Sequence, residues 1–232
     1  MYITFEGIVG SGKTTQVQKL VEYFESVTAS GAWRSSYKKD SLLFSGLLRS
    51  SQWQELPEVI HVREPGSTPI AEDIRYLAQT KEWEHEDMHP LTNAYLYVAA
   101  RAQTLETIVK PALERGDIVI SDRSFLSSCV IQWEAQWLGM ERVLEINLPI
   151  VRDTLPDVVL YLEVDIDTAL SRTFDPSGDK FEREGRDFYE EIVRGYEKCR
   201  NLEIIKDRFM TIDANRSQEE VFIDIISRLW QK

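Results

Sequence analysis

A glycine-rich segment near the start of the chain has the composition of a phosphate-binding loop. The residues Gly7-Ile8-Val9-Gly10-Ser11-Gly12-Lys13-Thr14 match the pattern G-x-x-x-x-G-K-[ST], and Thr15 follows them. Glycines at these positions permit positive φ angles and bring backbone N–H groups onto phosphate oxygens. We expect this loop, Gly7 to Thr15, to bind a nucleoside triphosphate, with Lys13 on the β- and γ-phosphates and the Thr14 hydroxyl on Mg²⁺.

Two further groups of charged residues follow apolar runs. Asp122 and Arg123 come directly after residues 118–121, and Arg63 follows residues 59–62. Ligands bind beyond the carboxyl ends of parallel strands, so these side chains should face the same phosphates. A carboxylate there can serve Mg²⁺, and a guanidinium can grip an acceptor phosphate bidentately. The alternatives are an ion pair between Asp122 and Arg123 at the strand end, and an ordinary charged turn at Arg63.

A helical pattern over residues 91–115 places a cation on an apolar face. Its apolar stripe consists of Ala94, Val98, Leu105, Ile108 and Ala112. Arg101 lies inside that stripe, and Tyr97 lies at its edge one turn earlier. An unpaired buried cation is costly, so Arg101 needs an acceptor. The acceptor is either an internal carboxylate or a nucleobase carbonyl, with the Tyr97 ring packing on the base in the second case.

These residues require a scaffold that brings distant strand ends together. Five β-rich runs alternate with helical patterns, which favours an α/β fold with a parallel sheet wrapped by helices. Each run is apolar on both faces, as in buried parallel strands. The expected strands are residues 2–5, 59–62, 118–121, 158–162 and 209–212. The expected helices are residues 13–26, 69–78, 91–115, 124–138, 141–151, 166–172, 187–201 and 217–231. Residues 29–55 interrupt this alternation as an insertion, and residues 175–185 indicate a mobile loop.

Composition limits the function classes. The chain has 232 residues, 43% of them hydrophobic, which suits one large domain. A net charge of −12 without a basic patch argues against binding an extended nucleic acid. No apolar run approaches the ~18 residues of a membrane-spanning helix. Cys129 and Cys199 have no metal-ligand spacing and are expected to be reduced thiols. We therefore expect a cytoplasmic protein that binds a small phosphorylated ligand.

Taken together, the motifs resemble the thymidylate kinase family of nucleoside monophosphate kinases. The resemblance covers most of the chain apart from residues 29–55. The matching segments are Phe5-Glu6-Gly7 with the phosphate loop and Thr15-Gln16, Arg63-Glu64-Pro65-Gly66, Ala99-Ala100-Arg101, Asp122-Arg123 with Ser127, Pro156-Asp157, Leu160-Tyr161-Leu162-Glu163-Val164 and Asp179-Lys180-Phe181-Glu182.

The resemblance implies a P-loop NTPase fold with a five-stranded parallel sheet, a mobile lid at residues 173–186, ATP and Mg²⁺ as cofactors, and a homodimer. The implied catalytic residues are Lys13, Asp122, Arg123 and Lys180. The implied acceptor-binding residues are Arg63 and Arg123 on the 5′-phosphate, Tyr97 and Arg101 on the base, and Ser127. The implied metal ligands are Thr14 and Asp122. The adenine of ATP is expected near the loop after Asp213 and Ala214.

The expected reaction is phosphorylation of dTMP to dTDP by ATP. Three departures from the family pattern leave other acceptors open. Val9 replaces an acidic residue that helps to fix the acceptor sugar, Ile131 lies in a segment that usually carries a sugar-packing tyrosine or phenylalanine, and Lys180 replaces a lid arginine. The alternatives are a kinase for another nucleoside or a modified deoxynucleotide, and a nucleotide-binding module without catalysis.

Overall fold

A parallel five-stranded sheet forms the centre of the chain. The computed structural model describes residues 1–30, 57–80, 86–135, 138–173 and 186–231. The strands are β1 (Tyr2–Glu6), β2 (Val59–Arg63), β3 (Ile118–Asp122), β4 (Val158–Glu163) and β5 (Phe209–Asp213), in the order β2-β3-β1-β4-β5. All neighbouring strands pair in parallel. The predicted α/β fold and all five predicted strands are confirmed.

Each strand continues one residue beyond its apolar run, into a charged side chain. Arg63 at the end of β2 pairs with Asp122 of β3, and Glu163 of β4 pairs with Asp213 of β5. Backbone pairing does not depend on side-chain polarity, so the ladder extends until the chain turns away. As a result, charged side chains gather at one edge of the sheet, where ligands of such folds bind.

The expectation that every strand is buried on both faces is wrong for the two edge strands. β1 and β3 are buried throughout, and β4 is buried except for Glu163. In β2 only Val62 is buried, and in β5 only Met210 and Ile212 are buried. An edge strand has a neighbour on one side alone, and the helices cover it less completely than they cover the centre.

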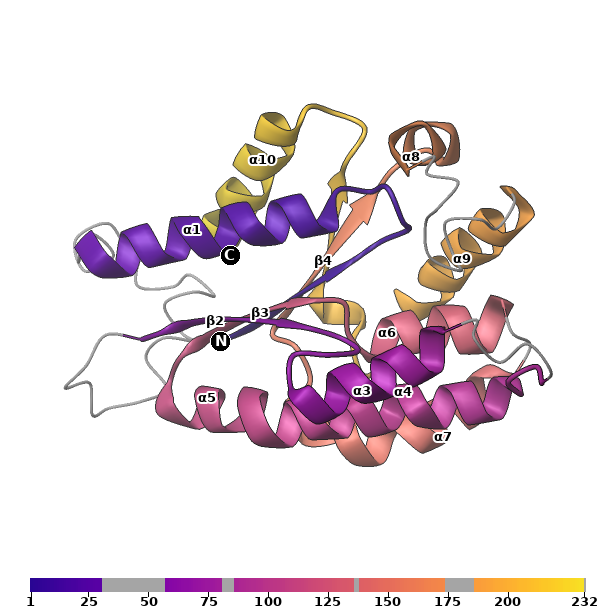
Figure 1. Ribbon diagram of the computed structural model, residues 1–232. Helices are drawn as coiled ribbons and strands as arrows, with labels where there is room; N and C mark the ends of the chain where they lie inside the picture. The colour runs from indigo at the N-terminus through magenta and orange to yellow at the C-terminus, as the bar shows by residue number, and fades with distance from the viewer. Residues whose placement is uncertain (31–56, 81–85, 136–137, 174–185, 232) are drawn as a thin grey trace.

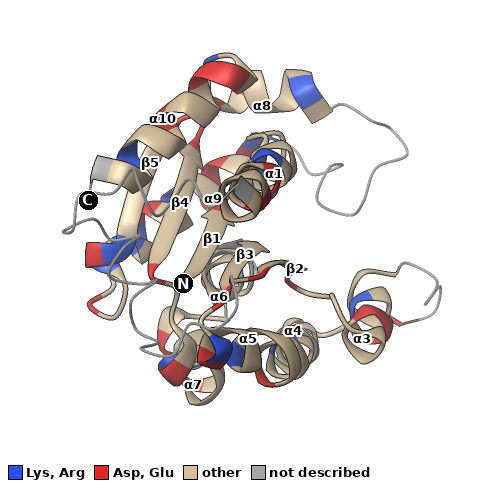
Figure 2. Ribbon diagram, turned by 90° about the vertical axis from the view of Figure 1, so that its left-hand side faces the viewer, with Lys and Arg blue, Asp and Glu red and all other residues tan. Residues whose placement is uncertain are grey.

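Helices lie on both faces of the sheet (Figures 1 and 2). α1 (Lys13–Ser30) and α10 (Gln218–Gln231) pack together on one face. The other face carries α4 (Pro90–Thr104), α5 (Lys110–Arg115), α6 (Phe125–Ser128) and α7 (Met140–Val151). α3 (Pro69–Gln79) packs against α4. The remaining described α-helices are α8 (Ile166–Thr173) and α9 (Arg186–Cys199). None of the described helices is long and apolar enough to cross a membrane.

Two of the expected helices contain π-helical segments. The helix predicted over residues 91–115 passes from α4 through the π-helical segment Leu105–Val109 into α5. Pro111 cannot donate a backbone hydrogen bond, and just before it the Lys110 amide bonds to the carbonyl of Leu105, five residues back. After α6, the π-helical segment Cys129–Ala135 takes the place of a regular helix.

The insertion and the lid fall almost entirely outside the described residues. α1 continues to Ser30, so the first two residues of the expected 29–55 insertion are helical. Thr173 ends α8 and Arg186 begins α9, while residues 174–185 between them, including Lys180, lie outside the described part of the chain. The division into one domain with an insertion and a lid stays a prediction.

Candidate active site

The glycine-rich loop wraps the end of β1 and leads into α1 at Lys13. The hydrogen bond from the Ser11 amide to the Ile8 carbonyl (3.2 Å) closes the turn. Gly10 and Gly12 have φ angles of +83° and +87°, a region that side chains with a Cβ rarely adopt. At Gly10 the space is also filled, because a Cβ there would lie 2.4 Å from the carbonyl oxygen of Ala169. The loop therefore has the conformation that the sequence pattern predicts.

Lys13 points back into its own loop. Its Nζ atom donates to the carbonyl oxygens of Gly7 (2.9 Å) and Ile8 (2.8 Å) and lies 3.3 Å from the Ser11 hydroxyl. Burial and the charge of Arg123 together lower the pKa of Lys13 to about 7, against the opposing charges of Asp122 and Glu6. A phosphate next to this ammonium would restore the charge balance that burial disturbs.

Asp122 and Thr14 form a pair of oxygen ligands at the end of β3. The Thr14 hydroxyl donates to the Asp122 carboxylate at 2.8 Å. Mg²⁺ prefers oxygen ligands and is often held by one or two carboxylates together with substrate phosphates. In the described part of the chain no three His, Cys, Asp or Glu side chains gather as a metal site. The Thr14–Asp122 pair therefore fits a Mg²⁺ ion that is shared with bound phosphates.

Two arginines line a wide cavity together with the phosphate loop. This cavity, of about 910 Å³, is lined by most phosphate-loop residues between Val9 and Thr15, by Asp122, and by both Arg63 and Arg123. Arg123 has a positive φ of 77° and donates to the Gly7 carbonyl (3.4 Å) and the Ser127 hydroxyl (3.2 Å). Arg63 forms a two-pronged ion pair with Glu72 (2.7 and 2.8 Å). Both arginines therefore border the same cavity as the phosphate loop.

A second, narrower pocket opens beside the first. Tyr97, Arg101, Ser127 and Ile131 line it, together with apolar side chains of α9. The predicted acceptor residues on α4 and after Asp122 therefore share one pocket. The two pockets have four lining residues in common: Val9, Glu64, Arg75 and Arg123. A molecule in the narrow pocket would thus reach the wide cavity at Arg123.

Arg101 has the internal carboxylate that was one of its two expected partners. Its Nε donates to Glu64 at 2.6 Å, and both side chains are 2% exposed. The remaining guanidinium nitrogens donate to Asn147, to the Ser124 carbonyl and to the Ser128 hydroxyl. Burial raises the pKa of Glu64, although Arg101 lowers it. Arg101 still lines the narrow pocket, so contact with a base remains a prediction.

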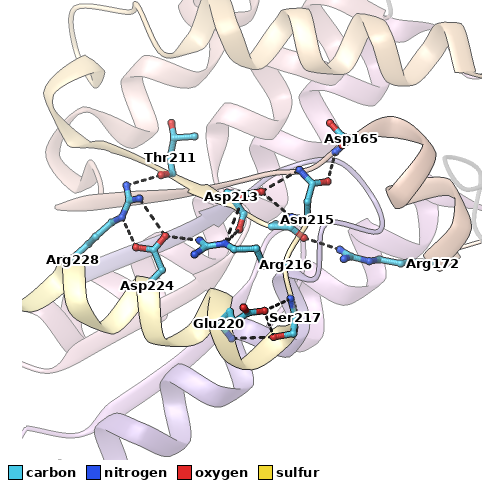
Figure 3. A network of polar contacts seen from close by, with 11 residues as sticks. Asp165, Arg172, Thr211, Asp213, Asn215, Arg216, Ser217, Glu220, Asp224 and Arg228 are labelled. Atoms are coloured by element: carbon cyan, nitrogen blue, oxygen red, sulfur yellow. Dashed lines mark hydrogen bonds and ion pairs between the residues drawn. The ribbon is translucent and has the colours of Figure 1, made fainter.

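The loop after β5, where adenine is expected, is held by a polar network (Figure 3). Asn215 accepts a hydrogen bond from the Asp165 amide, and Arg172 donates to the Ala214 carbonyl at 3.0 Å. Arg216 bridges Asp213 and Asp224. Arg172 and Gln218 also line the wide cavity, so this loop borders the space that contains the phosphate loop. Its position is compatible with a role in binding the nucleotide base.

Several lining residues were not identified from the sequence. Arg75 lies at the junction of the pockets and donates to the Pro65 carbonyl at 3.0 Å. Tyr189, Ile192 and Tyr196 project from α9 into the narrow pocket. Their spacing of three and seven residues indicates one buried helix face, but that pattern is the same whether the face meets the core or a pocket.

Comparison with known proteins agrees with this geometry. The family model for thymidylate kinase matches residues 41–225. A thymidylate kinase of Finegoldia magna is 36% identical over 99% of this chain and 97% of its own length, and one of Fervidobacterium nodosum is 34% identical over 97% and 96%. The crystal structure of a thymidylate kinase from Ehrlichia chaffeensis superimposes with a TM-score of 0.68, at 24% identity, over 99% of this chain and 98% of that one, which confirms the fold. The chain belongs to the thymidylate kinase family.

Proposed function

We propose that the protein transfers the γ-phosphoryl group of ATP to dTMP and forms dTDP. The observation that carries the proposal is the junction of two pockets at Arg123. One pocket contains the phosphate loop, and the other contains Tyr97 and Arg101. Membership of the thymidylate kinase family supports the same reaction.

In this proposal the chain works by positioning and by charge. The acceptor phosphate is already an anion near neutral pH, so it attacks the γ-phosphorus without a general base. Lys13 and Arg123 stabilise the charge that spreads over the transferring group, while Arg63 and Arg123 hold the acceptor phosphate. Tyr97 packs on the acceptor base, Arg101 bonds its edge, and Ser127 contributes to the same pocket. Lys180 is proposed to add positive charge from the lid.

Thr14 and Asp122 are the residues proposed to hold Mg²⁺. The ion supplies charge neutralisation for the triphosphate when it is bound. Asp122 lies at the end of β3, between Arg63 of β2 and the loop after β1, and this position supports a role for its carboxylate beside the phosphates.

The sugar end of the acceptor pocket has an apolar character that bears on specificity. Val9 lies at the pocket junction and Ile131 lines the narrow pocket, so both substitutions relative to the family pattern fall on the site itself. An aliphatic side chain cannot accept a hydrogen bond from a sugar hydroxyl. We therefore propose dTMP as the main acceptor, with tolerance for analogues that lack or modify that hydroxyl.

A coupled assay of ADP release tests the proposal. The purified chain is incubated with Mg-ATP and a panel of nucleoside monophosphates and nucleosides, and dTMP should give the highest kcat/KM. Lys13→Ala and Arg123→Ala should each reduce kcat by about 100-fold or more while melting near the wild-type temperature. Turnover of nucleosides alone, or binding of ATP without transfer to any acceptor, would refute the proposal in favour of a nucleoside kinase or a non-catalytic module.

Two features of the cellular context belong to the same proposal. We expect a homodimer acting in the cytoplasm on free nucleotides rather than on nucleic acid. Large hydrophobic side chains exposed on α3 and α4, including Ile70, Tyr76 and Tyr95, give a surface that a second copy could cover. Sedimentation of the purified chain measures the oligomeric state directly.

A further inference from the structure

Glu6 ends the central strand in full burial. Its side chain is 0% exposed. Three hydroxyl groups donate to its carboxylate: Ser124 to Oε1 at 2.6 Å, and Ser127 and Tyr196 to Oε2 at 2.8 Å each. In the described part of the chain Glu6 forms no ion pair, and it is not among the residues lining the two pockets. A buried carboxylate of this kind acts through its neighbours rather than on a substrate.

One of those neighbours leads directly to Arg123. The Arg123 guanidinium donates to the Ser127 hydroxyl at 3.2 Å, and that hydroxyl donates onward to Glu6. Because a hydroxyl has one proton, its bond to Glu6 leaves its lone pairs for Arg123. Tyr196 lies 3.3 Å from the same Ser127 oxygen. Glu6 therefore fixes the orientation of the Ser127 hydroxyl, which then accepts a hydrogen bond from Arg123.

Tyr196, like Ser127, acts as a hydrogen-bond donor to Glu6. Burial raises the pKa of Tyr196 well above its usual value, and the charge of Glu6 raises it further. The phenol consequently keeps its proton and donates a hydrogen bond to the Glu6 carboxylate. Its oxygen also lies 3.5 Å from the Gly7 carbonyl, the group to which both Arg123 and Lys13 donate. α9 is thereby connected to the phosphate loop through Glu6.

The charge of Glu6 reaches both cations of the site. The positive charges of Arg123 and Lys13 repel each other, and the negative charges of Glu6 and Asp122 stabilise both. Asp122 lies in the wide cavity, where Mg²⁺ would compete for its charge. Glu6 lies behind the site, so its charge stays available to the two cations when nucleotides occupy the front.

We infer that Glu6 is a positioning residue for phosphoryl transfer: through Ser127 and Tyr196 it holds the Arg123 guanidinium at the phosphate loop. This inference rests on the proposed function, because it assigns Glu6 a role in that reaction. It predicts that variants of Glu6 change both kcat and the KM for dTMP, because Arg123 is proposed to bind the acceptor phosphate.

Three variants test the inference in the coupled dTMP assay. Glu6→Gln removes the charge and forces one hydroxyl to turn, so kcat should fall about 10- to 100-fold. The KM for dTMP should rise as well, because Arg123 is no longer held in place; a mere loss of folded protein would lower kcat and leave KM unchanged. Glu6→Asp keeps the charge but shortens the reach, so both changes should be smaller than in Glu6→Gln. Tyr196→Phe removes one donor and should lower kcat several-fold.

The control is Glu163→Gln, the same change at the end of the neighbouring strand β4, where the side chain is 58% exposed and lies 3.8 Å from Arg200. It should leave both kcat and the KM for dTMP unchanged. Wild-type values of kcat and KM in Glu6→Gln would overturn the inference while the proposed function stands. If Glu6→Gln does not fold, Tyr196→Phe decides: reduced kcat at an unchanged melting temperature supports the inference, and wild-type kcat overturns it.

Failure of the proposed function itself has a different signature. In that case the wild-type chain would not phosphorylate dTMP at all. The role of Glu6 would then be measured as the affinity for ATP, by calorimetry. Glu6→Gln should bind ATP more weakly than wild type, because Arg123 is no longer held at the phosphate loop, and equal affinity would overturn the inference.

Discussion

The buried ion pair between Arg101 and Glu64 offers a quantitative test of the site's construction. In Glu64→Gln the guanidinium loses its charged partner at 2.6 Å, in surroundings where both side chains are 2% exposed. Breaking such a pair costs roughly 3–5 kcal/mol of unfolding free energy, because a charge is left buried and uncompensated. Asn147, Ser128 and the Ser124 carbonyl still accept from Arg101, so the lower end, about 3 kcal/mol, is expected.

For a chain of this length, about 3 kcal/mol lowers the melting temperature by roughly 6–12 °C. Thermal and urea unfolding of Glu64→Gln measure the loss, with an unchanged m-value as evidence that the folded state is intact. The matched control is Glu72→Gln, which breaks a similarly short pair with Arg63 at a site where the two side chains are 47% and 41% exposed. Exposed pairs contribute about 0–1 kcal/mol, so this variant should unfold near wild type.

A double variant tests whether the Arg101–Glu64 ion pair is more or less stabilising than apolar residues at the same positions. Burial raises the pKa of Glu64 even though Arg101 opposes the shift, which indicates that desolvation outweighs the attraction. Replacing both residues, in Glu64→Leu/Arg101→Met, should therefore recover part of the stability lost in Glu64→Gln. Recovery should be incomplete, because the hydroxyl of Tyr2 and the amide of Asn147 lose their partners. Equal stability of Glu64→Gln and Glu72→Gln would refute the reasoning.

Three further expectations concern the phosphate loop. Because the pKa of Lys13 is lowered to about 7, ATP binding should take up a proton above that pH, and affinity measured by calorimetry should fall about tenfold per unit between pH 8 and 9; a flat profile would contradict this. In urea unfolding, Gly10→Ala should lower the free energy of unfolding by about 1–3 kcal/mol more than Gly12→Ala. Both glycines have a positive φ, but a Cβ at Gly10 meets Ala169, whereas the space at Gly12 is open. Val9→Asp should favour dTMP over its 3′-deoxy analogue by about tenfold in kcat/KM, and an unchanged ratio would place Val9 away from the sugar.

The sequence alone determined the sheet and the donor half of the site. Apolar runs with turn residues between them predict five strands. Such runs are local patterns, so they can be identified without knowledge of the fold. The phosphate loop is similarly local, since Gly7 to Thr14 are contiguous and their spacing encodes the turn. The order of the strands, and the extension of each strand by one charged residue, became clear only when the strands paired, because register depends on the neighbouring strand.

The acceptor half of the site depended on tertiary structure. The sequence placed Arg101 on an apolar face and required an acceptor, yet two acceptors satisfied that requirement equally well. Packing of α4 against the turn after β2 decided for Glu64, 37 residues away. The same holds for Glu6 and Tyr196, which are 190 residues apart and meet at 2.8 Å. Helical and strand periodicity state which side of an element is buried, but only the packed fold states which polar groups share that interior.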